Sequence, residues 1–271
     1  MKKILIITLV LLVGMYMFYN MNKKEDNNIT NNFEEDRYMF ISYIDYSYLK
    51  GKDEKGLKEE IDKIVLNIKN SNFNGIILQV RAFSDAIYNS KIYSPSLKIV
   101  NNEDDKLNLD LLDYFIKKSH ENNIKLIAWI NPYRIRSNND ISNISENNVV
   151  YKYLNTSNVE IKEGIYSNPA SDEVLDLIVN GVLEIVENYN VDGILYDDYF
   201  YPSKTCDLKD YELYKTQGGT KSLEDFRRDN INKLITKTYE KIKEVKKDVL
   251  FGISPSGNMN NNYNDEYLDI N

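Results

Sequence analysis

The stretch that decides the fold is "VDGILYDDYFYP", residues 191–202, in which a short apolar run leads directly into two adjacent carboxylates. A continuous apolar run is typical of a strand that is covered on both faces, as in a parallel sheet. The run ends at Asp197 and Asp198. Parallel α/β folds place their active sites at the carboxyl ends of such strands. The stretch therefore predicts a buried strand that delivers acidic side chains to a site.

Five apolar runs of this kind occur along the chain, separated by amphipathic stretches with helical periodicity. The runs are "YMFISYI" (38–44), "GIILQV" (75–80), "KLIAWI" (125–130), "GILY" (193–196) and "VLFGIS" (249–254). The amphipathic stretches cover residues 57–68, 109–123, 174–185 and 231–245. This alternation predicts an α/β fold in which a parallel sheet is joined by crossover helices.

Composition limits the classes of function. A hydrophobic fraction of 42% in 271 residues is enough for a large core, and the net charge of -8 argues against a nucleic-acid partner. The chain has one His and one Cys, Cys206, which nearly excludes a zinc site. An oxygen-liganded Ca²⁺ or Mg²⁺ site has no support, so we expect no metal and no cofactor. The sequence does not predict an oligomeric state.

The N-terminus begins with Lys2 and Lys3, followed by an apolar run over residues 4–19. Such a run is either the core of a signal peptide or a short membrane anchor, which we assign to residues 1–21. No small-residue cleavage motif follows Tyr19, which favours an uncleaved anchor with the rest of the chain outside. Residues 22–37 are polar and predict a tether, and the folded domain is expected over 38–271. With the anchor in this orientation, we expect the folded domain to be extracytoplasmic.

Polar side chains follow all five predicted strands, and long segments at 81–106, 131–170 and 197–221 connect three of these strands to the next helix. Because parallel strands all end at one edge of a sheet, we expect these side chains to share one mouth. The candidates for substrate binding are Gln79, Arg81, Trp129, Asn131, Tyr133, Arg134, Tyr199, Tyr201 and Ser254.

The chemistry expected of this mouth is glycoside hydrolysis, which needs a proton donor and a second carboxylate. Adjacent strand residues point to opposite faces, so Asp197 and Asp198 do not flank the same bond. We assign Asp198 as the acid or nucleophile, Asp197 as a group that orients it or binds a sugar hydroxyl, and Asp85 as the best visible partner. The alternative is that both acids only pair with arginines.

Two arginines and the single tryptophan stand out among the binding candidates. A guanidinium suits a substrate carboxylate and a catalytic Asp equally well, so the partners of Arg81 and Arg134 stay open. Trp129 serves either as a platform for sugar rings or as part of the core.

The chain resembles the glycosyl-hydrolase-like family 10, formerly a domain of unknown function, over nearly everything from Tyr38 onward. The resemblance rests on "ISYIDYSYLKGK", "NGIILQVRAFSDAIYNSKIYSPS", "IKLIAWINPYRI", "SNPASDEVLDLIVNGVLEIVENYNVDGILYDDYFYP", "DFRRDNINKLI" and "VLFGISPSGN". It implies a (β/α)8 TIM barrel in an extracytoplasmic bacterial protein that cleaves peptidoglycan glycan strands stripped of their peptides. The matching positions are Gln79, Arg81, Asp85, Asn131, Pro132, Tyr133, Arg134, Asn168, Asp197, Asp198, Tyr199 and Ser254.

The sequence also departs from the family. Ala82, Ser84 and Ser256 replace the usual residues in two loops, and the family continues into further strands beyond this chain. About five strand-helix units cannot close an eight-stranded barrel. We therefore expect a barrel that is incomplete at the C-terminus, as in a truncated product, with an open edge at its last strand.

Two hypotheses of different classes follow. The first is a glycoside hydrolase of amino-sugar polysaccharides, in which a substrate N-acetyl group could itself supply the nucleophile. A chitinase-type acid spacing is absent, because Leu195 and Tyr199 occupy the positions of its acids. The second is a non-catalytic glycan-binding or wall-tethering protein. A polysaccharide deacetylase would need a metal triad that one His cannot furnish.

Overall fold

The structure is a computed structural model that describes residues 35–198 and 200–269. Every described helix and strand lies within Arg37–Asn271. The predicted anchor over residues 1–21 and most of the predicted tether over 22–37 lie outside the described residues. Within the described ranges, no helix has the length and hydrophobicity needed to cross a membrane.

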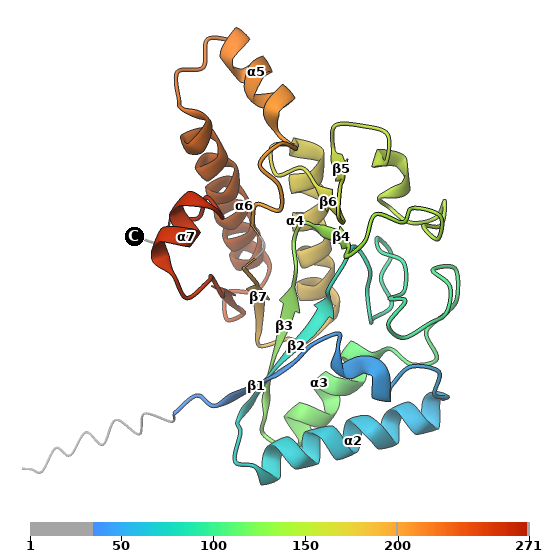
Figure 1. Cartoon of the computed structure of the whole chain (residues 1–271). Coiled ribbons are helices and arrows are strands. Elements are labelled where there is room, and N and C mark those ends of the chain that lie inside the picture. The colour runs from blue at the N-terminus through green and yellow to red at the C-terminus, as the bar shows by residue number, and fades with distance from the viewer. Residues whose placement is uncertain (1–34, 199, 270–271) are drawn as a thin grey trace, which may run out of the picture. The chain divides into compact units, whose positions relative to one another are not determined.

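Five parallel strands form the main sheet, in the order in which they occur along the chain (Figure 1). They are β1 (Tyr38–Ile41), β2 (Gly75–Arg81), β3 (Lys125–Ile130), β7 (Gly193–Tyr196) and β8 (Leu250–Ile253). Each strand pairs in parallel with the next. The predicted α/β fold with a parallel sheet is confirmed. Four strands lie within their predicted runs, and β2 is one residue longer than its run because it includes Arg81.

Four long helices connect these strands: α2 (Glu54–Asn70), α3 (Leu111–Glu121), α4 (Asp172–Asn188) and α6 (Leu223–Val245). Each begins after a residue whose side chain accepts a backbone N–H of the first turn, namely Asp53, Asp110, Ser171 and Ser222. The predicted capping residue Ser222 accepts from Asp225 N–H at 3.1 Å. In Figure 1, α2 lies beside α3 and α4 lies beside α6, so the helices pack in pairs.

The two faces of the sheet differ in exposure. On the helix-side face, Ile76, Leu126 and Ile194 are at most 1% exposed and belong to the main hydrophobic core. We call the opposite face, which carries Phe40, Ile77, Gln79, Trp129, Leu195 and Leu250, the inner face. Phe40 and Leu250 on this face are 50% and 55% exposed. The inner face is thus open to solvent at the outer strands, and the core lies between the sheet and its helices.

The long connection between β3 and α4 folds into a small antiparallel sheet that the sequence analysis did not predict. Its strands are β4 (Arg134–Arg136), β5 (Val159–Ile161) and β6 (Ile165–Ser167), in the order β4-β6-β5. A separate hydrophobic cluster supports it, formed by Ile135, Ile144, Val150, Tyr153, Val159 and Ile165. Strands of three residues are too short to show a periodic pattern.

Four other short helices were also not predicted. They are the 3-10 helices η1 (Asp45–Tyr48) and η2 (Tyr151–Tyr153) and the α-helices α5 (Leu208–Thr216) and α7 (Met259–Asn264). No side chain of α5 is buried, so this helix has no apolar face that periodicity could reveal.

A register shift in β2 changes the position of Arg81. Gln79 pairs with Trp129 on the inner face, but Arg81 pairs with Ile130, so one extra residue is accommodated between them. A β-bulge of this kind moves the following side chain to the other face. Arg81 therefore points to the helix side and is only 2% exposed. The expectation that Arg81 lies at the mouth was wrong, because strict alternation does not hold across the bulge.

The Arg81 guanidinium lies in a pocket of aromatic side chains. Its Cζ is 4.2 Å from the centre of the Tyr93 ring, a distance suited to a cation–π contact. Gly181 of α4 provides the room: a Cβ there would be 2.0 Å from Arg81 Nη1 and 2.5 Å from Tyr93 Cε2. Both neighbours are buried, so neither has free space into which it can move.

We predict that Gly181→Ala lowers the free energy of unfolding. Helix propensity alone would favour alanine by about 1 kcal/mol, but overpacking a filled core costs about 1 to 3 kcal/mol. The net loss is expected to be about 1 kcal/mol and is measured as a lower urea midpoint. Gly257→Ala is the matched control, since nothing lies within 4 Å of its added Cβ. An unchanged or higher midpoint for Gly181→Ala would contradict the packing argument.

Candidate functional site

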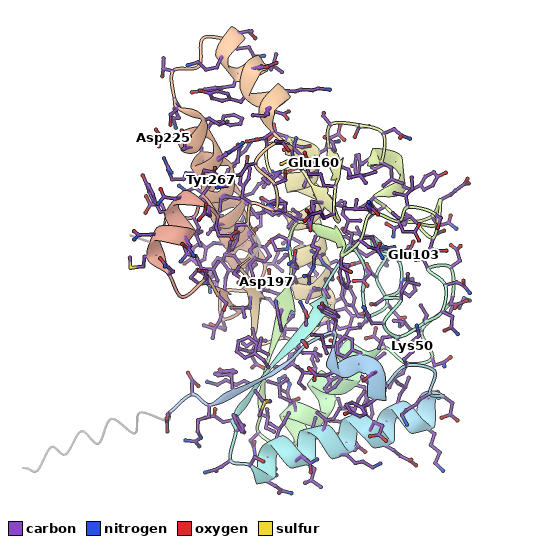
Figure 2. The ribbon with its side chains drawn as sticks, viewed as in Figure 1. Lys50, Glu103, Glu160, Asp197, Asp225 and Tyr267 are labelled. Carbon is purple, nitrogen blue, oxygen red and sulfur yellow. The ribbon has the colours of Figure 1, made fainter. Side chains whose placement is uncertain are left out.

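Asp197 is the residue around which the candidate site is built. It directly follows β7, and alternation from Leu195 directs its side chain to the inner face. Its Oδ2 accepts hydrogen bonds from Trp129 Nε1 at 3.0 Å and from Asn131 Nδ2 at 3.2 Å. Figure 2 shows Asp197 where the central strands end. The ends of β3 and β7 thus converge as the sequence predicts.

The two oxygens of this carboxyl differ in their surroundings. Asp197 is 7% exposed, and its Oδ1 is buried without a hydrogen bond to any described residue. Burial raises the pKa of Asp197 to about 6, and the negative charge of Asp198 acts in the same direction. Trp129, Arg134 and Asn131 oppose the shift by stabilising the carboxylate. A buried acid with one unsatisfied oxygen and a raised pKa is a candidate functional group.

Asn131 and Trp129 hold this carboxyl in place. Asn131 is 2% exposed, and its Oδ1 accepts the Arg134 N–H at 2.9 Å. The same side chain therefore holds the backbone of the loop after β3 and orients the Asp197 carboxyl. Trp129 is partly exposed and packs edge-on against Phe40, with ring centres 5.6 Å apart. Of the two interpretations of Trp129, the platform fits this placement, because the ring is on the open inner face.

Asp198 is more exposed than Asp197, and it begins the loop that leads to Pro202. Tyr199, a predicted binding residue, lies outside the described residues. Tyr201 is 5% exposed and its hydroxyl donates to Asp207 Oδ2 at 2.5 Å, so its hydroxyl is used inside the protein. Ser254 is partly exposed, and its N–H donates to the Tyr196 carbonyl at 2.8 Å, which places it beside the end of β7.

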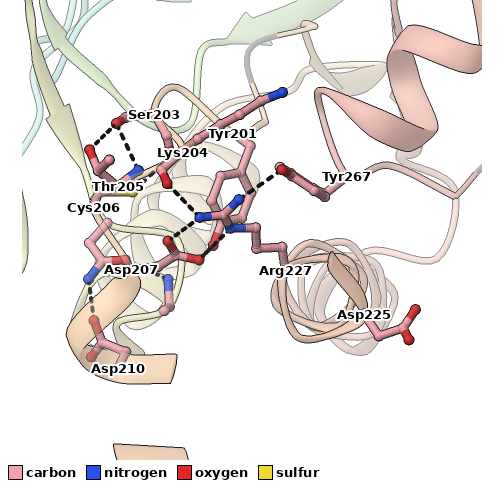
Figure 3. Close-up of polar contacts among 12 residues, drawn as sticks. Tyr201, Ser203, Lys204, Thr205, Cys206, Asp207, Asp210, Asp225, Arg227 and Tyr267 are labelled. Atoms are coloured by element: carbon pink, nitrogen blue, oxygen red, sulfur yellow. Dashed lines mark hydrogen bonds and ion pairs between the residues drawn. The ribbon is translucent and has the colours of Figure 1, made fainter. Parts of the chain in front are cut away.

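A buried ion pair fixes the loop after β7. Arg227 of α6 donates to both oxygens of Asp207, at 2.7 Å from Nε and 2.8 Å from Nη2. Its other contacts are Tyr267 Oη at 2.8 Å and the Lys204 carbonyl at 2.7 Å (Figure 3). A bidentate, fully hydrogen-bonded pair restricts the loop to one arrangement.

Two cations and two aromatic rings lie together near the ends of β1, β2 and β3. The Tyr43 and Phe83 rings are 5.2 Å apart. Lys98 Nζ lies 5.0 Å from the Tyr43 ring centre, and Arg134 Cζ lies 4.8 Å from that of Phe83. We call these four residues the cationic shelf. Arg134 also stabilises the Asp197 carboxylate, so the shelf adjoins the candidate site. Sequence reasoning found only Arg134, because Lys98 lies in a long loop without periodicity.

Asp85 occupies a different environment. It is 4% exposed, and it accepts the Phe83 N–H at 3.2 Å. Ser96 and Arg136 stabilise its charge, while burial raises its pKa. A cleft of about 150 Å³ adjoins it, lined by Phe83, Asp85, Leu97, Lys98, Arg136, Ser137 and Asn138. Asp85 therefore lies beside the shelf, and the groups described around it include Phe83, Ser96 and Arg136 of β4 but neither Asp197 nor Asp198.

Gln79 and Tyr133 are buried as well. Gln79 is 1% exposed, its Oε1 accepts the Tyr43 N–H at 3.1 Å, and its carbonyl accepts the Tyr46 hydroxyl. Tyr133 is 1% exposed, and its hydroxyl has no hydrogen-bond partner among the described residues. Gln79 thus supports the shelf through Tyr43. The described ranges contain no group of three or more His, Cys, Asp or Glu side chains that could hold a metal ion.

A family model described as glycosyl hydrolase-like 10 matches residues 29–271. The chain belongs to this family. Among the relatives of this glycosyl hydrolase-like 10 chain is the glycosyl hydrolase YngK of Bacillus subtilis (strain 168), 34% identical over 222 residues, which are 79% of this chain and 43% of YngK. The glycosyl hydrolase DigH of Escherichia coli (strain K12) is 33% identical over 215 residues, 76% of this chain and 49% of DigH. The chain spans about half the length of these relatives.

A solved structure supports the fold. The α-L-fucosidase isoenzyme 2 from Paenibacillus thiaminolyticus superposes with a TM-score of 0.54 at 17% identity, over 85% of this chain and 34% of the fucosidase chain. The parallel sheet with its helices is thus the TIM-barrel type of glycoside hydrolases, matched over part of the larger protein. At this identity the likeness concerns the fold alone.

We predict that Asp197→Asn is more stable than the parent at pH 7 but not at pH 4. A carboxyl with a pKa near 6 in the folded state and 3.8 as its ordinary value binds its proton more tightly when folded. The free energy of unfolding therefore falls as pH rises through this interval. The amide of Asn does not titrate, so the variant does not lose this part of the free energy of unfolding, which is on the order of 2 kcal/mol at pH 7. Urea unfolding from pH 4 to 7 measures the difference.

The control for this comparison is Asp248→Asn, because Asp248 is exposed and lies after α6, away from the site. Any pH dependence that the two variants share comes from the loss of a negative charge and not from burial of the carboxyl. A difference between Asp197→Asn and the parent that is the same at pH 4 and pH 7 would show that burial does not raise the pKa of Asp197.

Proposed function

We propose that this protein hydrolyses O-glycosidic bonds of an amino-sugar polysaccharide, with peptidoglycan glycan strands stripped of their peptides as the substrate. The observation that carries the proposal is the Asp197 carboxyl at the end of β7, with Oδ2 held by Trp129 and Asn131 and Oδ1 without a hydrogen bond to any residue that the structure describes. The membership in a family of glycosyl hydrolase-like proteins supports the same reaction class.

The two adjacent acids take different roles. Asp198 is partly exposed, so it can approach the glycosidic bond as the carboxylate that activates water or attacks. Asp197 lies deeper, where Oδ1, which has no hydrogen bond within the described part of the chain, can accept one from a sugar hydroxyl. Trp129 offers the partly exposed ring on which the sugar stacks.

The cationic shelf supports an anionic substrate. Muramic acid carries a lactyl carboxylate, and Lys98 and Arg134 are positioned together over the Tyr43 and Phe83 rings. Arg81, which the sequence suggested for this role, is buried on the helix side, and Lys98 takes its place in the proposal. The predicted N-terminal apolar segment would hold the protein at the outer surface of the membrane, where such strands occur.

We predict that Asp198→Asn abolishes the release of reducing ends from denuded glycan strands by the full chain. Loss of a carboxylate that acts on the reacting atoms lowers the rate by about 100-fold or more. The measurement is a reducing-end assay, with glycan pull-down in parallel. Binding without release by the unmodified chain would instead support a glycan-binding or wall-tethering protein. Asp248→Asn should release reducing ends at the rate of the parent.

We predict that Lys98→Gln weakens the preference for carboxylated glycan. Lys98 is partly exposed, so the loss of one charge-assisted contact should lower kcat/KM by about 3- to 10-fold. The effect should disappear on strands whose lactyl carboxylate has been reduced to an alcohol. Lys247→Gln, at an exposed lysine beyond α6, is the control. Equal losses on both substrates would contradict recognition of the carboxylate by the shelf.

A further inference from the structure

A pocket of about 450 Å³ is formed by the segment after η1, the long loop after β2 and the loop after β4. Figure 2 shows Lys50 and Glu103 of this pocket at one flank of the domain and Asp197 nearer its middle. Pockets of about 300 to 1,000 Å³ are the usual size for small ligands. We call it the asparagine pocket, because its lining includes Leu97, Asn101, Asn102, Ser142, Asn143 and Ile144.

The asparagine pocket adjoins the cleft of about 150 Å³ beside the cationic shelf. Leu97 lines both. The ion pair between Arg136 and Glu103 joins them as well, because Arg136 lines the cleft and Glu103 lines the pocket. Phe83 and Lys98 belong to the cleft and also to the shelf. Shelf, cleft and pocket therefore follow one another along the surface.

Hydrogen bonds connect this path to the acid at the end of β7. Arg134 of the shelf donates its N–H to Asn131 Oδ1 at 2.9 Å. Asn131 Nδ2 in turn donates to Asp197 Oδ2 at 3.2 Å. A polymer that is bound at the acids and extends across the shelf would thus reach the asparagine pocket with a further unit.

The charged groups that line the pocket have partners within the protein. Glu103 is 5% exposed, pairs with Arg136 and accepts the Ser145 N–H at 2.9 Å. Asp104 accepts the Ser145 hydroxyl at 2.7 Å. Lys50 Nζ donates to a backbone carbonyl of the loop after β2 at 2.8 Å. A charged ligand would have to displace these partners, so the pocket favours a neutral one.

Two exposed asparagines offer the groups that a neutral ligand needs. Asn101 and Asn102 donate their backbone N–H groups to Asp105 Oδ2, at 3.2 Å and 2.8 Å. Their side-chain amides make no hydrogen bond within the described ranges. A primary amide carries two N–H donors and one acceptor, which suit the N–H and the carbonyl of an acetamido group. Leu97 and Ile144 provide apolar surface for its methyl group.

We propose that the asparagine pocket binds a neutral, N-acetylated amino-sugar unit of the glycan strand whose cleavage is proposed above. The inference rests on the proposed function and deepens it. The cationic shelf then takes a unit that carries a carboxylate, and the pocket takes a unit that does not. The affinity for a strand should therefore rise once the strand is long enough to reach the pocket.

The test measures the binding of a soluble, neutral oligomer of N-acetylglucosamine to the full chain by calorimetry. The double variant Asn101→Ala/Asn102→Ala should bind it about 5- to 30-fold more weakly, because two neutral hydrogen bonds are lost. The backbone hydrogen bonds to Asp105 stay in the variant, so its urea midpoint should equal that of the parent. Unchanged affinity in the double variant, or equal affinity of the parent for a glucose oligomer of the same length, would overturn the proposal.

A second variant approaches the pocket from another loop. Ser142 is exposed and follows β4, so Ser142→Trp should fill the pocket with its ring and weaken the binding of the oligomer at least as much. The matched control is Asn67→Ala/Asn70→Ala, at two exposed asparagines of α2, which should bind as the parent does. A loss of affinity in the control equal to that in the pocket variants would also overturn the proposal.

Hydrolysis distinguishes this inference from the proposed function. On long denuded strands, Asn101→Ala/Asn102→Ala should raise KM by the same factor and leave kcat unchanged, because the lost contacts lie away from the reacting bond. On the shortest fragments that the parent cleaves, variant and parent should agree. If the parent releases no reducing ends but its binding of the oligomer depends on the two asparagines, only the proposed function is wrong. If the parent is active and the variant keeps its KM on long strands, only the assignment of the pocket is overturned.

Discussion

The free-energy cost of keeping the Asp197 carboxyl out of water is the constraint on which the site depends. Two donors, Trp129 and Asn131, stabilise one of its oxygens, and the other is left without a partner among the described residues. A protein that only needed to end a strand would leave such a group in solvent, where it costs nothing. The parallel sheet makes the arrangement possible, because β3 and β7 bring their ends to the same edge.

The strands and long helices could be predicted because their signals are local. Continuous apolar runs and helical periodicity locate β1, β2, β3, β7 and β8 and the four helices that cover them. The contact between Trp129 and Asp197 follows from the same reasoning, since both residues lie at the ends of neighbouring strands. The small sheet of β4, β5 and β6 could not be predicted, because it forms by pairing between segments with no pattern of their own.

The predicted position of Arg81 was wrong because of a single irregularity in the backbone of β2. Alternation from Gln79 would place it on the inner face beside the acids, but the bulge in β2 places it among tyrosines in the core. The cost of burying this guanidinium is offset by cation–π contact with Tyr93, and Gly181 leaves the space that it fills. Lys98 lies in the loop that follows β2, so the cation near the mouth comes from a position that the strand pattern does not reveal.

Burial raises the pKa of Asp197, and the negative charge of the adjacent Asp198 acts in the same direction. Two neighbouring carboxylates cannot both be charged in a buried site at low cost, and the Arg134 guanidinium offsets part of that cost. The two acids therefore differ in environment: Asp197 is 7% exposed, whereas Asp198 is partly exposed and can meet a substrate, as the proposed hydrolysis requires of its reacting carboxylate.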